Sequence, residues 1–222
     1  MNGKIVAITG ANGRLGSRFA ARFAERGARI AAIVRSQKSA DGLHGPNLTP
    51  FVADLTDEAA VAACFQQIHA HFGTLDALLH TAGGWDGRPF LDTTLADWQR
   101  LVDGNLTSAF LCFREAARLM AEKGGRLIGI ASGQGADKGR ARQGAYSASK
   151  GGLIRLVEAI AEEYAGTGLT AHAIAPSSIR YNPDEVAAQG GVDANHLADL
   201  ALYLCSEAGT SLNGATLRAY GS

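Results

Sequence analysis

The chain has 222 residues, 46% of them hydrophobic, which is enough for one α/β domain with a single core. Lysine plus arginine and aspartate plus glutamate each number 21, so there is no basic field to attract nucleic acid and no acidic tail. No signal-peptide pattern precedes the first apolar segment and no apolar run reaches membrane-spanning length, so we expect a cytoplasmic protein with no membrane partner.

The first predicted unit is a strand, a glycine turn and a helix. Residues 4–9 (KIVAIT) form a short apolar run, and Leu15, Phe19 and Phe23 follow at helical spacing. Glycines let a ligand approach the backbone, and free N–H groups at a helix start attract an anion. We therefore expect a dinucleotide diphosphate here, the alternative being a structural turn. The candidate contacts are Gly10, Asn12, Gly13, Arg14, Leu15 and Gly16.

The end of the second predicted strand, residues 29–34 (RIAAIV), bears on cofactor choice. A carboxylate at such a position binds the ribose 2′-hydroxyl and repels a 2′-phosphate. Here Val34 is followed by Arg35 and Ser36, a cation and a hydroxyl. This pair favours NADP(H), with NAD(H) possible. The alternative is an ordinary solvent-facing arginine.

A third strand is predicted at residues 51–53 and ends at Asp54 and Leu55. The Asp54 carboxylate could accept a hydrogen bond from an adenine amino group. Alternatively Asp54, Thr56 or Asp57 caps the helix that runs through Phe72. Because Thr56 or Asp57 can fill the cap, Asp54 stays a candidate cofactor contact.

Residues 76–80 (DALLH) predict the fourth strand, which leads into Thr81, Ala82 and Gly83. These small residues would admit a flat ligand against the backbone, so all three are candidate cofactor contacts. His80 could be a catalytic imidazole, but a lone histidine at a strand end is more often a hydrogen-bonded structural group.

A long helical pattern covers residues 95–122 and contains Asn105 within its apolar stripe. A buried amide needs partners, and Gly104 beside it weakens a helix by about 1 kcal/mol relative to alanine. We therefore expect a local departure from the regular helical ladder there. Asn105 either bonds a neighbouring backbone or takes part in relaying protons.

The fifth predicted strand, residues 126–131, delivers Ser132, and a glycine-rich loop leads to a helix that carries Tyr146 and Lys150. Positions four apart share one helix face, so the phenol and the ammonium would point into one space. A neighbouring cation favours the phenolate, so we predict that Lys150 lowers the pKa of Tyr146 and makes it a general acid or base. The alternative is a surface tyrosine packed on a lysine stem.

A sixth strand is predicted at residues 169–175, closed by Pro176. Residues 177–194 are predicted to form a loop over the site, in which Ser177 and Ile179 join Pro176 as candidate cofactor contacts. A last helix begins at residue 193 or 195, and residues 215–220 form a closing strand. Substrate specificity is expected to depend on residues 85–91 and 177–191. The three cysteines, at positions 64, 112 and 205, are far apart and are predicted to be reduced core fillers, with no metal site.

Together these motifs resemble the short-chain dehydrogenase/reductase family over nearly the full length. They occur in the family's order: TGANGRLG, Asp54, TAG at residues 81–83, Asn105, Ser132, the YSASK box and Pro176. The resemblance implies a single α/β domain over residues 1–222, a Rossmann-type doubly wound parallel sheet with helices on both faces. It also implies that Tyr146 donates or accepts the proton, Lys150 lowers its pKa and binds the nicotinamide ribose, Ser132 orients the substrate oxygen and Asn105 holds a water relay. Relatives of this kind are commonly homodimers or homotetramers.

Some motifs depart from the family pattern. The glycine turn has TGxxGxxG spacing in place of TGxxxGxG, His80 and Thr81 replace the usual Asn-Asn, and Ser177 follows Pro176 where glycine is usual. The stretch AGGW at residues 82–85 resembles dihydropteridine reductases. Our hypothesis is an NADP(H)-dependent enzyme that reduces a small-molecule carbonyl or oxidises an alcohol. The alternatives are a dihydropteridine reductase-like enzyme and a catalytically idle NADP-binding sensor.

Overall fold

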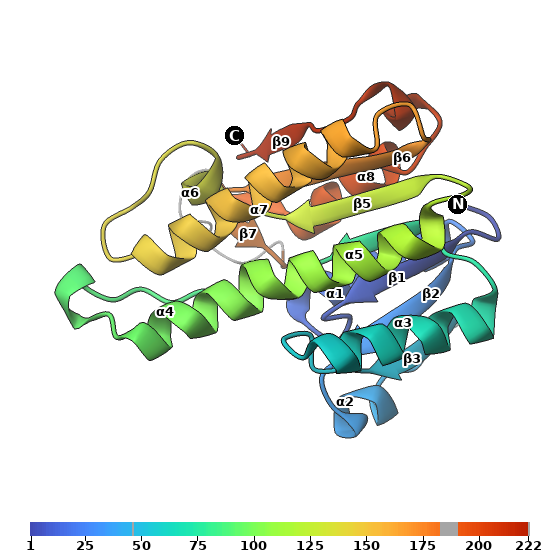
Figure 1. Ribbon diagram of the computed structural model, residues 1–222, viewed down its shortest axis with the longest axis horizontal. Coiled ribbons are helices and arrows are strands. Elements are labelled where there is room, and N and C mark those ends of the chain that lie inside the picture. Colours follow the sequence, from blue (N-terminus) through green and yellow to red (C-terminus); the bar gives the residue numbers. More distant parts are fainter. Residues whose placement is uncertain (46, 183–190, 222) are drawn as a thin grey trace.

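Seven parallel strands form the centre of the computed structural model, which describes residues 1–45, 47–182 and 191–221 (Figure 1). The strand order is β3-β2-β1-β4-β5-β6-β9, and every neighbouring pair is parallel. The strands are β1 (Ile5–Thr9), β2 (Arg29–Val34), β3 (Leu48–Val52), β4 (Ala77–His80), β5 (Gly125–Ile130), β6 (Leu169–Pro176) and β9 (Thr216–Ala219). A second, small sheet pairs β7 (Ile179–Arg180) with β8 (Val192–Asp193).

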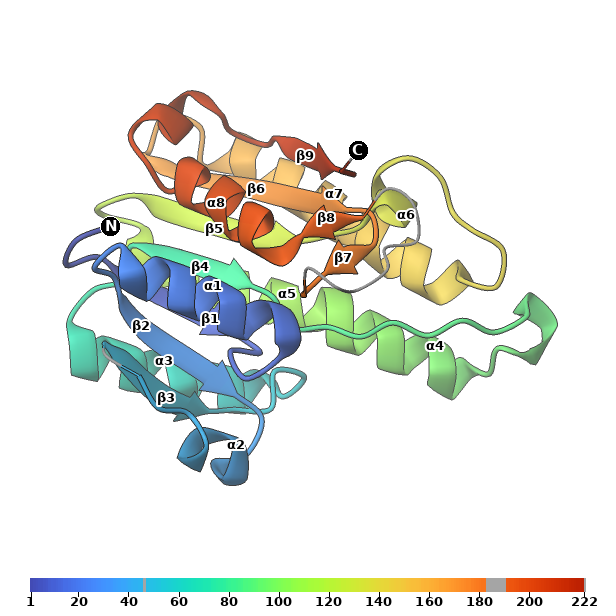
Figure 2. The same cartoon turned by 180° about the vertical axis from the view of Figure 1, so that it is seen from behind.

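Helices cover both faces of the sheet, as the two opposite views show (Figures 1 and 2). Successive residues of β1 bury into different cores: Ile5 and Ala7 on the face of α3, α5 and α7, and Val6 and Ile8 on the face of α1 and α8. A strand buried on both faces must be apolar throughout, which is why KIVAIT does not alternate. The helices are α1 (Arg14–Glu25), α2 (Gln37–Asp41), α3 (Glu58–Phe72), α4 (Leu95–Val102), α5 (Ser108–Met120), α6 (Gly133–Ala136), α7 (Gly144–Glu163) and α8 (Ala194–Leu204).

The strand order reverses direction between β1 and β4. From β1 the chain moves to β2 and β3 on one side, and from β4 to β5, β6 and β9 on the other. Ligands of open parallel sheets bind outside the carboxyl ends of the strands at such a point. The predicted doubly wound fold is therefore confirmed, and it brings the glycine turn after β1 beside residues 81–83 after β4.

The long helix predicted over residues 95–122 is interrupted at Asn105, as the sequence predicts. A π-helical segment, Asp103–Thr107, joins α4 to α5, and Asn105 within it is fully buried. Such bulges insert an extra residue and occur frequently at functional sites. Here the bulge turns the amide toward β4, while α4 continues as an arm beyond the sheet (Figure 1).

Short elements account for most differences from the predicted pattern. β3 begins at Leu48 and includes Pro50, which a strand tolerates here because β3 is at the edge of the sheet. α2, α6, β7 and β8 were not predicted, since segments of two to five residues are too short to show periodicity. The predicted loop 177–194 includes β7 and β8, and its residues 183–190 lie outside the described part of the chain.

Within the described ranges, none of the helices has both the length and the apolar character that crossing a bilayer requires. All three cysteines are free thiols: Cys64 and Cys112 are buried, as expected of core fillers, whereas Cys205 is partly exposed.

Candidate active site

The glycine turn packs tightly against the segment after β4. Gly10 has φ +62°, and an added Cβ there would lie 3.2 Å from the Ala82 Cα. A Cβ on Gly16 would lie 2.2 Å from the Gly10 carbonyl oxygen, so α1 can start this close to the turn only with glycine. Gly13 is the N-cap of α1 and provides no side-chain cap. The N-cap residue of α1 thus offers no side-chain acceptor to the N–H groups of the first turn.

Arg14, another predicted cofactor contact in this turn, packs against the aromatic ring of Tyr181. Its guanidinium carbon lies 4.0 Å from the centre of the Tyr181 ring. Arg18, one turn later on α1, donates to the Tyr181 carbonyl oxygen at 3.1 Å. These contacts join the glycine turn to the segment that follows β7.

A cavity of about 410 Å³ lies beside the turn at the carboxyl ends of β1, β2 and β3. Arg35 is exposed and lines it. Ser36 instead is the N-cap of α2, where its Oγ accepts the Ser39 N–H at 3.3 Å. The other predicted contacts that line this cavity are Gly10, Asn12, Gly13, Leu55, Thr81, Ala82 and Gly83. Eight of the predicted cofactor contacts, from separate parts of the chain, therefore meet at this cavity.

Asp54 is held in a local turn. Its Oδ1 accepts the Thr56 N–H at 3.0 Å and the Thr56 hydroxyl at 2.7 Å, while Asp57 caps α3. The hydrogen bonds from Thr56 are the main cause of the lowered pKa of Asp54, and the charge of Arg35 adds to them. Asp54 is therefore ionised at neutral pH, with one oxygen already engaged.

A larger cleft of about 690 Å³ continues from this cavity, with Thr81, Gly83 and Gly84 lining both. Ser132, Tyr146 and Lys150 line it together, although they come from α6 and α7. Ser132 is the N-cap of α6 at the end of β5, and its Oγ accepts the Gly135 N–H at 3.3 Å. The other predicted contacts in this cleft are Leu15, Pro176, Ser177 and Ile179.

The prediction that Lys150 lowers the pKa of Tyr146 is wrong for the protein's own groups. Burial raises the pKa of Tyr146, and hydrogen bonding to Ser132 lowers it only in part. The Lys150 ammonium is buried and donates to the Ile130 carbonyl oxygen at 2.7 Å. Burial lowers the pKa of Lys150 to about 8. Desolvation thus outweighs the expected charge effect, and Tyr146 is a protonated phenol at neutral pH.

The lowered pKa of Lys150 has a consequence for stability. The unfolded side chain titrates near 10.5 and the folded one near 8, so the buried ammonium opposes folding at every pH below about 8. Between these values only the unfolded chain keeps the proton. The contribution of Lys150 to the free energy of unfolding therefore rises with pH across that window.

We expect Lys150→Met to stabilise the protein. The lowering of the Lys150 pKa from 10.5 to about 8 corresponds to an unfavourable burial of roughly 3 kcal/mol, which the substitution removes. The substitution also removes the hydrogen bond to the Ile130 carbonyl, which costs about 1–2 kcal/mol. Urea unfolding at pH 7 should show a net gain of about 1–2 kcal/mol over the unaltered protein, and this gain should fall as the pH rises from 8 to 10.5. Exposed Lys123→Met is the control and should differ from the unaltered protein by the same amount at every pH in that window. A less stable Lys150→Met protein at pH 7 would contradict this account.

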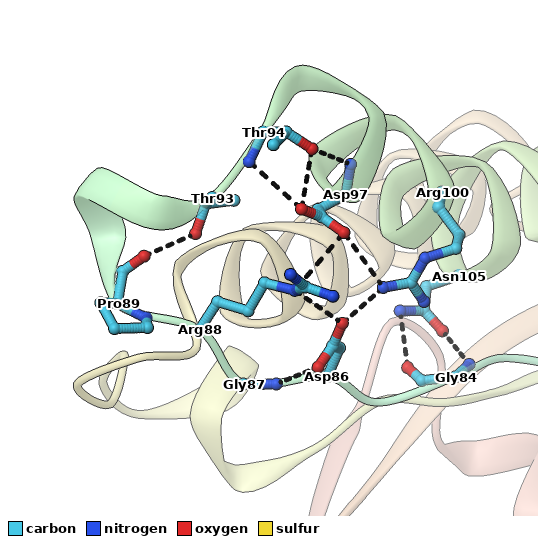
Figure 3. Close-up of polar contacts among 10 residues, drawn as sticks. All are labelled: Gly84, Asp86, Gly87, Arg88, Pro89, Thr93, Thr94, Asp97, Arg100 and Asn105. Carbon is cyan, nitrogen blue, oxygen red and sulfur yellow. Dashed lines mark hydrogen bonds and ion pairs between the residues drawn. The ribbon is translucent and has the colours of Figure 1, made fainter.

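Asn105 bonds to Gly84 in the segment after β4 (Figure 3) and also to α7. Its Oδ1 accepts the Gly84 N–H at 2.8 Å, and its Nδ2 donates to the Gly84 carbonyl at 3.0 Å and to Ser149 Oγ at 3.1 Å. Ser149 Oγ in turn donates to the Tyr146 carbonyl at 2.8 Å. The Asn105 amide thus bonds a neighbouring backbone and positions the helical turn that carries Tyr146. A relay function of Asn105 stays a prediction.

His80 is fully buried and its ring nitrogens lie between two hydroxyls. Thr9 Oγ1 is 3.2 Å from Nδ1, and Ser108 Oγ is 3.2 Å from Nε2. Because Ser108 Oγ donates to the Gly104 carbonyl and Thr9 Oγ1 accepts the Ala82 N–H, the Thr9 hydroxyl donates to Nδ1 and Nε2–H donates to Ser108. Burial lowers the pKa of His80 to about 3, so it is neutral. Of the two interpretations, the hydrogen-bonded structural group fits.

Polar contacts also attach the segment 84–94 to α4 (Figure 3). Arg100 Nη2 lies 2.5 Å from Asp86 Oδ2, and Arg88 Nε lies 3.4 Å from both Asp86 and Asp97. Asp97 forms a capping box with Thr94 at the start of α4. This network fixes the part of the chain that carries Trp85. Trp85 lines the larger cleft, where a residue of the segment 85–91 could contact a substrate.

Several cleft residues were missed from the sequence. Gln134 lies in α6, Asp137, Lys138 and Arg140 lie in the loop between α6 and α7, and Tyr220 directly follows β9. The sequence signal is the glycine-rich composition of residues 133–144, which predicts a loop but not where that loop lies. Tyr220 has no local signal, because only the parallel pairing of β9 with β6 brings it to the cleft.

Comparisons with known proteins agree with this geometry. The family model described as short chain dehydrogenase matches residues 4–187. D-threitol dehydrogenase of Mycolicibacterium smegmatis is 29% identical over 98% of this chain and 91% of its own length. 2-Dehydro-3-deoxy-L-rhamnonate dehydrogenase (NAD(+)) of a Sphingomonas species is 34% identical over 79% of this chain and 72% of its own.

Among solved structures, the crystal structure of gox2181 superimposes with a TM-score of 0.91 at 24% identity, covering 99% of this chain and 95% of that one. This likeness supports the fold, and the sequence matches support the family. The chain belongs to the short-chain dehydrogenase/reductase family and is an oxidoreductase that acts on CH–OH and C=O groups.

Proposed function

We propose that this chain is an NADP(H)-dependent enzyme that reduces a small-molecule carbonyl, or oxidises the corresponding alcohol, with Tyr146 as the proton donor or acceptor. The observation that carries the proposal is that Ser132, Tyr146 and Lys150 line one cleft that continues into the cavity beside the glycine turn. A hydroxyl, a phenol and an ammonium then face one space at the carboxyl ends of the strands.

The residues present fit a dinucleotide. The start of α1 has no side-chain cap, and Gly16 keeps the turn free of a Cβ that would lie 2.2 Å from the Gly10 carbonyl oxygen. Backbone N–H groups of this turn would hold the diphosphate. Arg35, Leu55 and residues 81–83 would hold the adenosine half, and Pro176, Ser177 and Ile179 the nicotinamide half. Bound nicotinamide supplies or accepts the hydride.

The protein's own groups would handle the proton. Because its pKa is raised, Tyr146 keeps its proton at neutral pH and can give it to the developing alkoxide of the substrate. Ser132 Oγ accepts the Gly135 N–H, and its hydroxyl, which hydrogen-bonds Tyr146 in the free protein, would turn to donate to the same oxygen. Lys150, charged below about pH 8, would stabilise the phenolate that remains.

A panel of ketones and aldehydes, followed by the absorbance of NADPH, tests the proposal. Consumption of NADPH with at least one carbonyl compound is the expected result. Tight NADPH binding with no turnover of any compound would favour the idle sensor. Turnover of quinonoid dihydropterin alone would favour the dihydropteridine reductase-like alternative, which the AGGW stretch suggests.

Cofactor choice gives a further prediction. Arg35 is an exposed cation lining the adenosine cavity and should contact a 2′-phosphate. We expect Arg35→Gln to raise the Kd of NADPH about tenfold, or roughly 1.4 kcal/mol, and to leave that of NADH unchanged. Fluorescence titration of both cofactors measures this. NADH is included because the rhamnonate dehydrogenase relative is named as an NAD(+) enzyme. If the unaltered protein binds NADH more tightly than NADPH, Arg35 does not select a 2′-phosphate.

We also propose a homodimer or homotetramer. Phe90, Leu91, Leu95 and Trp98 are 85%, 93%, 70% and 43% exposed on the arm formed by the 3₁₀ turn Phe90–Asp92 and α4. Contiguous exposed apolar side chains indicate an interaction surface. We expect Leu95→Asp/Trp98→Asp to lower the mass measured by light scattering to that of a monomer, and the Val52→Asp control to leave it unchanged. A monomeric unaltered protein would contradict the proposal.

A further inference from the structure

We propose that the cleft selects carbonyl substrates that carry a negative charge, such as oxo-carboxylates, and that Lys138 and Arg140 determine this specificity. The inference rests on the proposed function and adds the substrate class to it. Both residues line the same cleft as Ser132 and Tyr146, on the loop between α6 and α7.

The charges lining the described part of the cleft are unequal in sign. Lys138, Arg140 and Lys150 are cations, and Asp137 is the sole carboxylate among the described lining residues. Low-dielectric walls focus the field of such charges and raise the local concentration of an oppositely charged ligand. The whole chain has 21 basic and 21 acidic residues, so this positive cleft is a local feature.

Asp137 does not neutralise the two loop cations, because it is engaged elsewhere. Arg218 Nε lies 2.7 Å from its Oδ1, and the Tyr220 hydroxyl donates to its Oδ2 at 2.5 Å. These bonds lower the pKa of Asp137, and the bond from Arg218 contributes most. Asp137 and Arg218 thus cancel one another and leave the charges of Lys138 and Arg140 in the cleft.

Two other cations, on the segment that carries Trp85 and on α4, are paired. Arg88 and Arg100 lie within 4 Å of Asp86 and Asp97, as Figure 3 shows. By contrast, within the part of the chain that the structure describes, the side chains of Lys138 and Arg140 make neither an ion pair nor a hydrogen bond. Exposed cations are ordinarily just solvated, but these two also line the cleft that holds the proposed proton donor. A substrate anion would give them a partner.

Their position separates the substrate charge from the cofactor charge. The glycine turn and α1 would hold the diphosphate on one side of the cleft. Residues 138 and 140 lie instead in the loop that follows α6, the short helix that Ser132 caps. A carbonyl oxygen at Ser132 and Tyr146 would then leave the rest of an oxo acid on the side of the α6–α7 loop. Trp85 lines the same cleft and offers an apolar surface to the carbon chain.

The test compares charged and neutral forms of the same substrates. A set of 2-oxo and 4-oxo carboxylic acids, each with its methyl ester, is assayed with NADPH for the unaltered protein and for Lys138→Gln/Arg140→Gln. Each ester keeps the carbon skeleton and removes the charge, and comparing the acid-to-ester ratio of kcat/KM between variants cancels intrinsic reactivity. The control, Lys123→Gln/Arg155→Gln, removes two exposed cations outside the cleft.

We expect the double variant to lose about tenfold or more in kcat/KM for an acid and less than about twofold for its ester, since each lost charge contact is worth a few-fold. Added salt at 0.5 M should reduce the preference for acids in the unaltered protein, because exposed charges are screened. The control should match the unaltered protein in both respects.

Two results overturn the inference. One is that no acid is turned over better by the unaltered protein than by the double variant. The other is an equal loss for acids and esters, which would indicate a structural effect of the two substitutions. If the esters are still reduced through Tyr146, the proposed function survives and only the substrate class is wrong. If neither acids nor esters consume NADPH, both fail.

Discussion

Tyr146→Phe should reduce kcat for carbonyl reduction by about a thousandfold, within the range that a positioned general acid contributes. The substitution keeps the buried ring and removes only the hydroxyl that the proposal assigns to the proton. Since Tyr146 lines the cleft and its side chain is mostly buried, phenylalanine fits without a cavity. Steady-state NADPH consumption measures kcat, and the KM for NADPH should stay within about twofold because the ring contacts remain.

Tyr203→Phe is the matched control. Tyr203 is 46% exposed on α8, and its loss of a hydroxyl should leave kcat unchanged. Equal Tm values for both variants and the unaltered protein would show that the loss is chemical. Undiminished turnover by Tyr146→Phe would refute the mechanism and leave a nucleotide-binding protein whose chemistry lies elsewhere.

Much of the fold could be predicted because its main signals are local. The apolar run of residues 29–34 matches β2 residue for residue, and Gly27, with φ +82°, follows the C-cap of α1. Gly104 and Asn105 correctly predicted the interruption of the long helix. Pro50 misled the prediction of β3, because its tolerance depends on being at the sheet edge, which sequence order alone does not reveal.

The candidate site was predictable where family motifs and helical spacing coincide. Ser132, Tyr146 and Lys150 line one cleft as expected. Their electrostatics were not predictable, because the pKa of Tyr146 depends on burial, which outweighs the helical neighbour. Lys138 and Arg140 were missed for a related reason: a loop without periodicity reveals its position only after α6 and α7 are placed.

Asn105 and His80 are polar residues within apolar segments, and both join elements of the fold through buried hydrogen bonds. Both are fully buried, and both have every side-chain nitrogen engaged or within hydrogen-bond distance of a partner. His80 joins the end of β1 to Ser108 at the start of α5, and Asn105 joins the π-helical segment to Gly84 and α7. The sequence could mark these positions, but their partners are set by the tertiary fold.

Gly16→Ala should raise the Kd of NADPH about a hundredfold, or roughly 2.7 kcal/mol, and lower stability by about 1–3 kcal/mol. Its Cβ would lie 2.2 Å from the Gly10 carbonyl oxygen and 2.9 Å from Thr81 Oγ1. Neither atom can move aside at low cost. Gly10 already packs against Ala82, and Thr81 Oγ1 donates to the Thr9 carbonyl at 2.6 Å. The turn must therefore shift, and with it the N–H groups proposed to hold the diphosphate.

Gly42→Ala is the control, since a Cβ there meets nothing closer than 3.8 Å and its φ of −84° suits alanine. It should keep cofactor affinity and gain about 0.4–1 kcal/mol of stability by restricting the unfolded chain. Measuring stability by urea unfolding without cofactor, and affinity by fluorescence titration on the folded fraction, separates the two effects of Gly16→Ala. A variant that is destabilised yet binds NADPH normally would place the diphosphate away from this turn. Normal stability and normal affinity would mean that α1 has room to withdraw, contrary to the packing seen between Gly16 and Gly10.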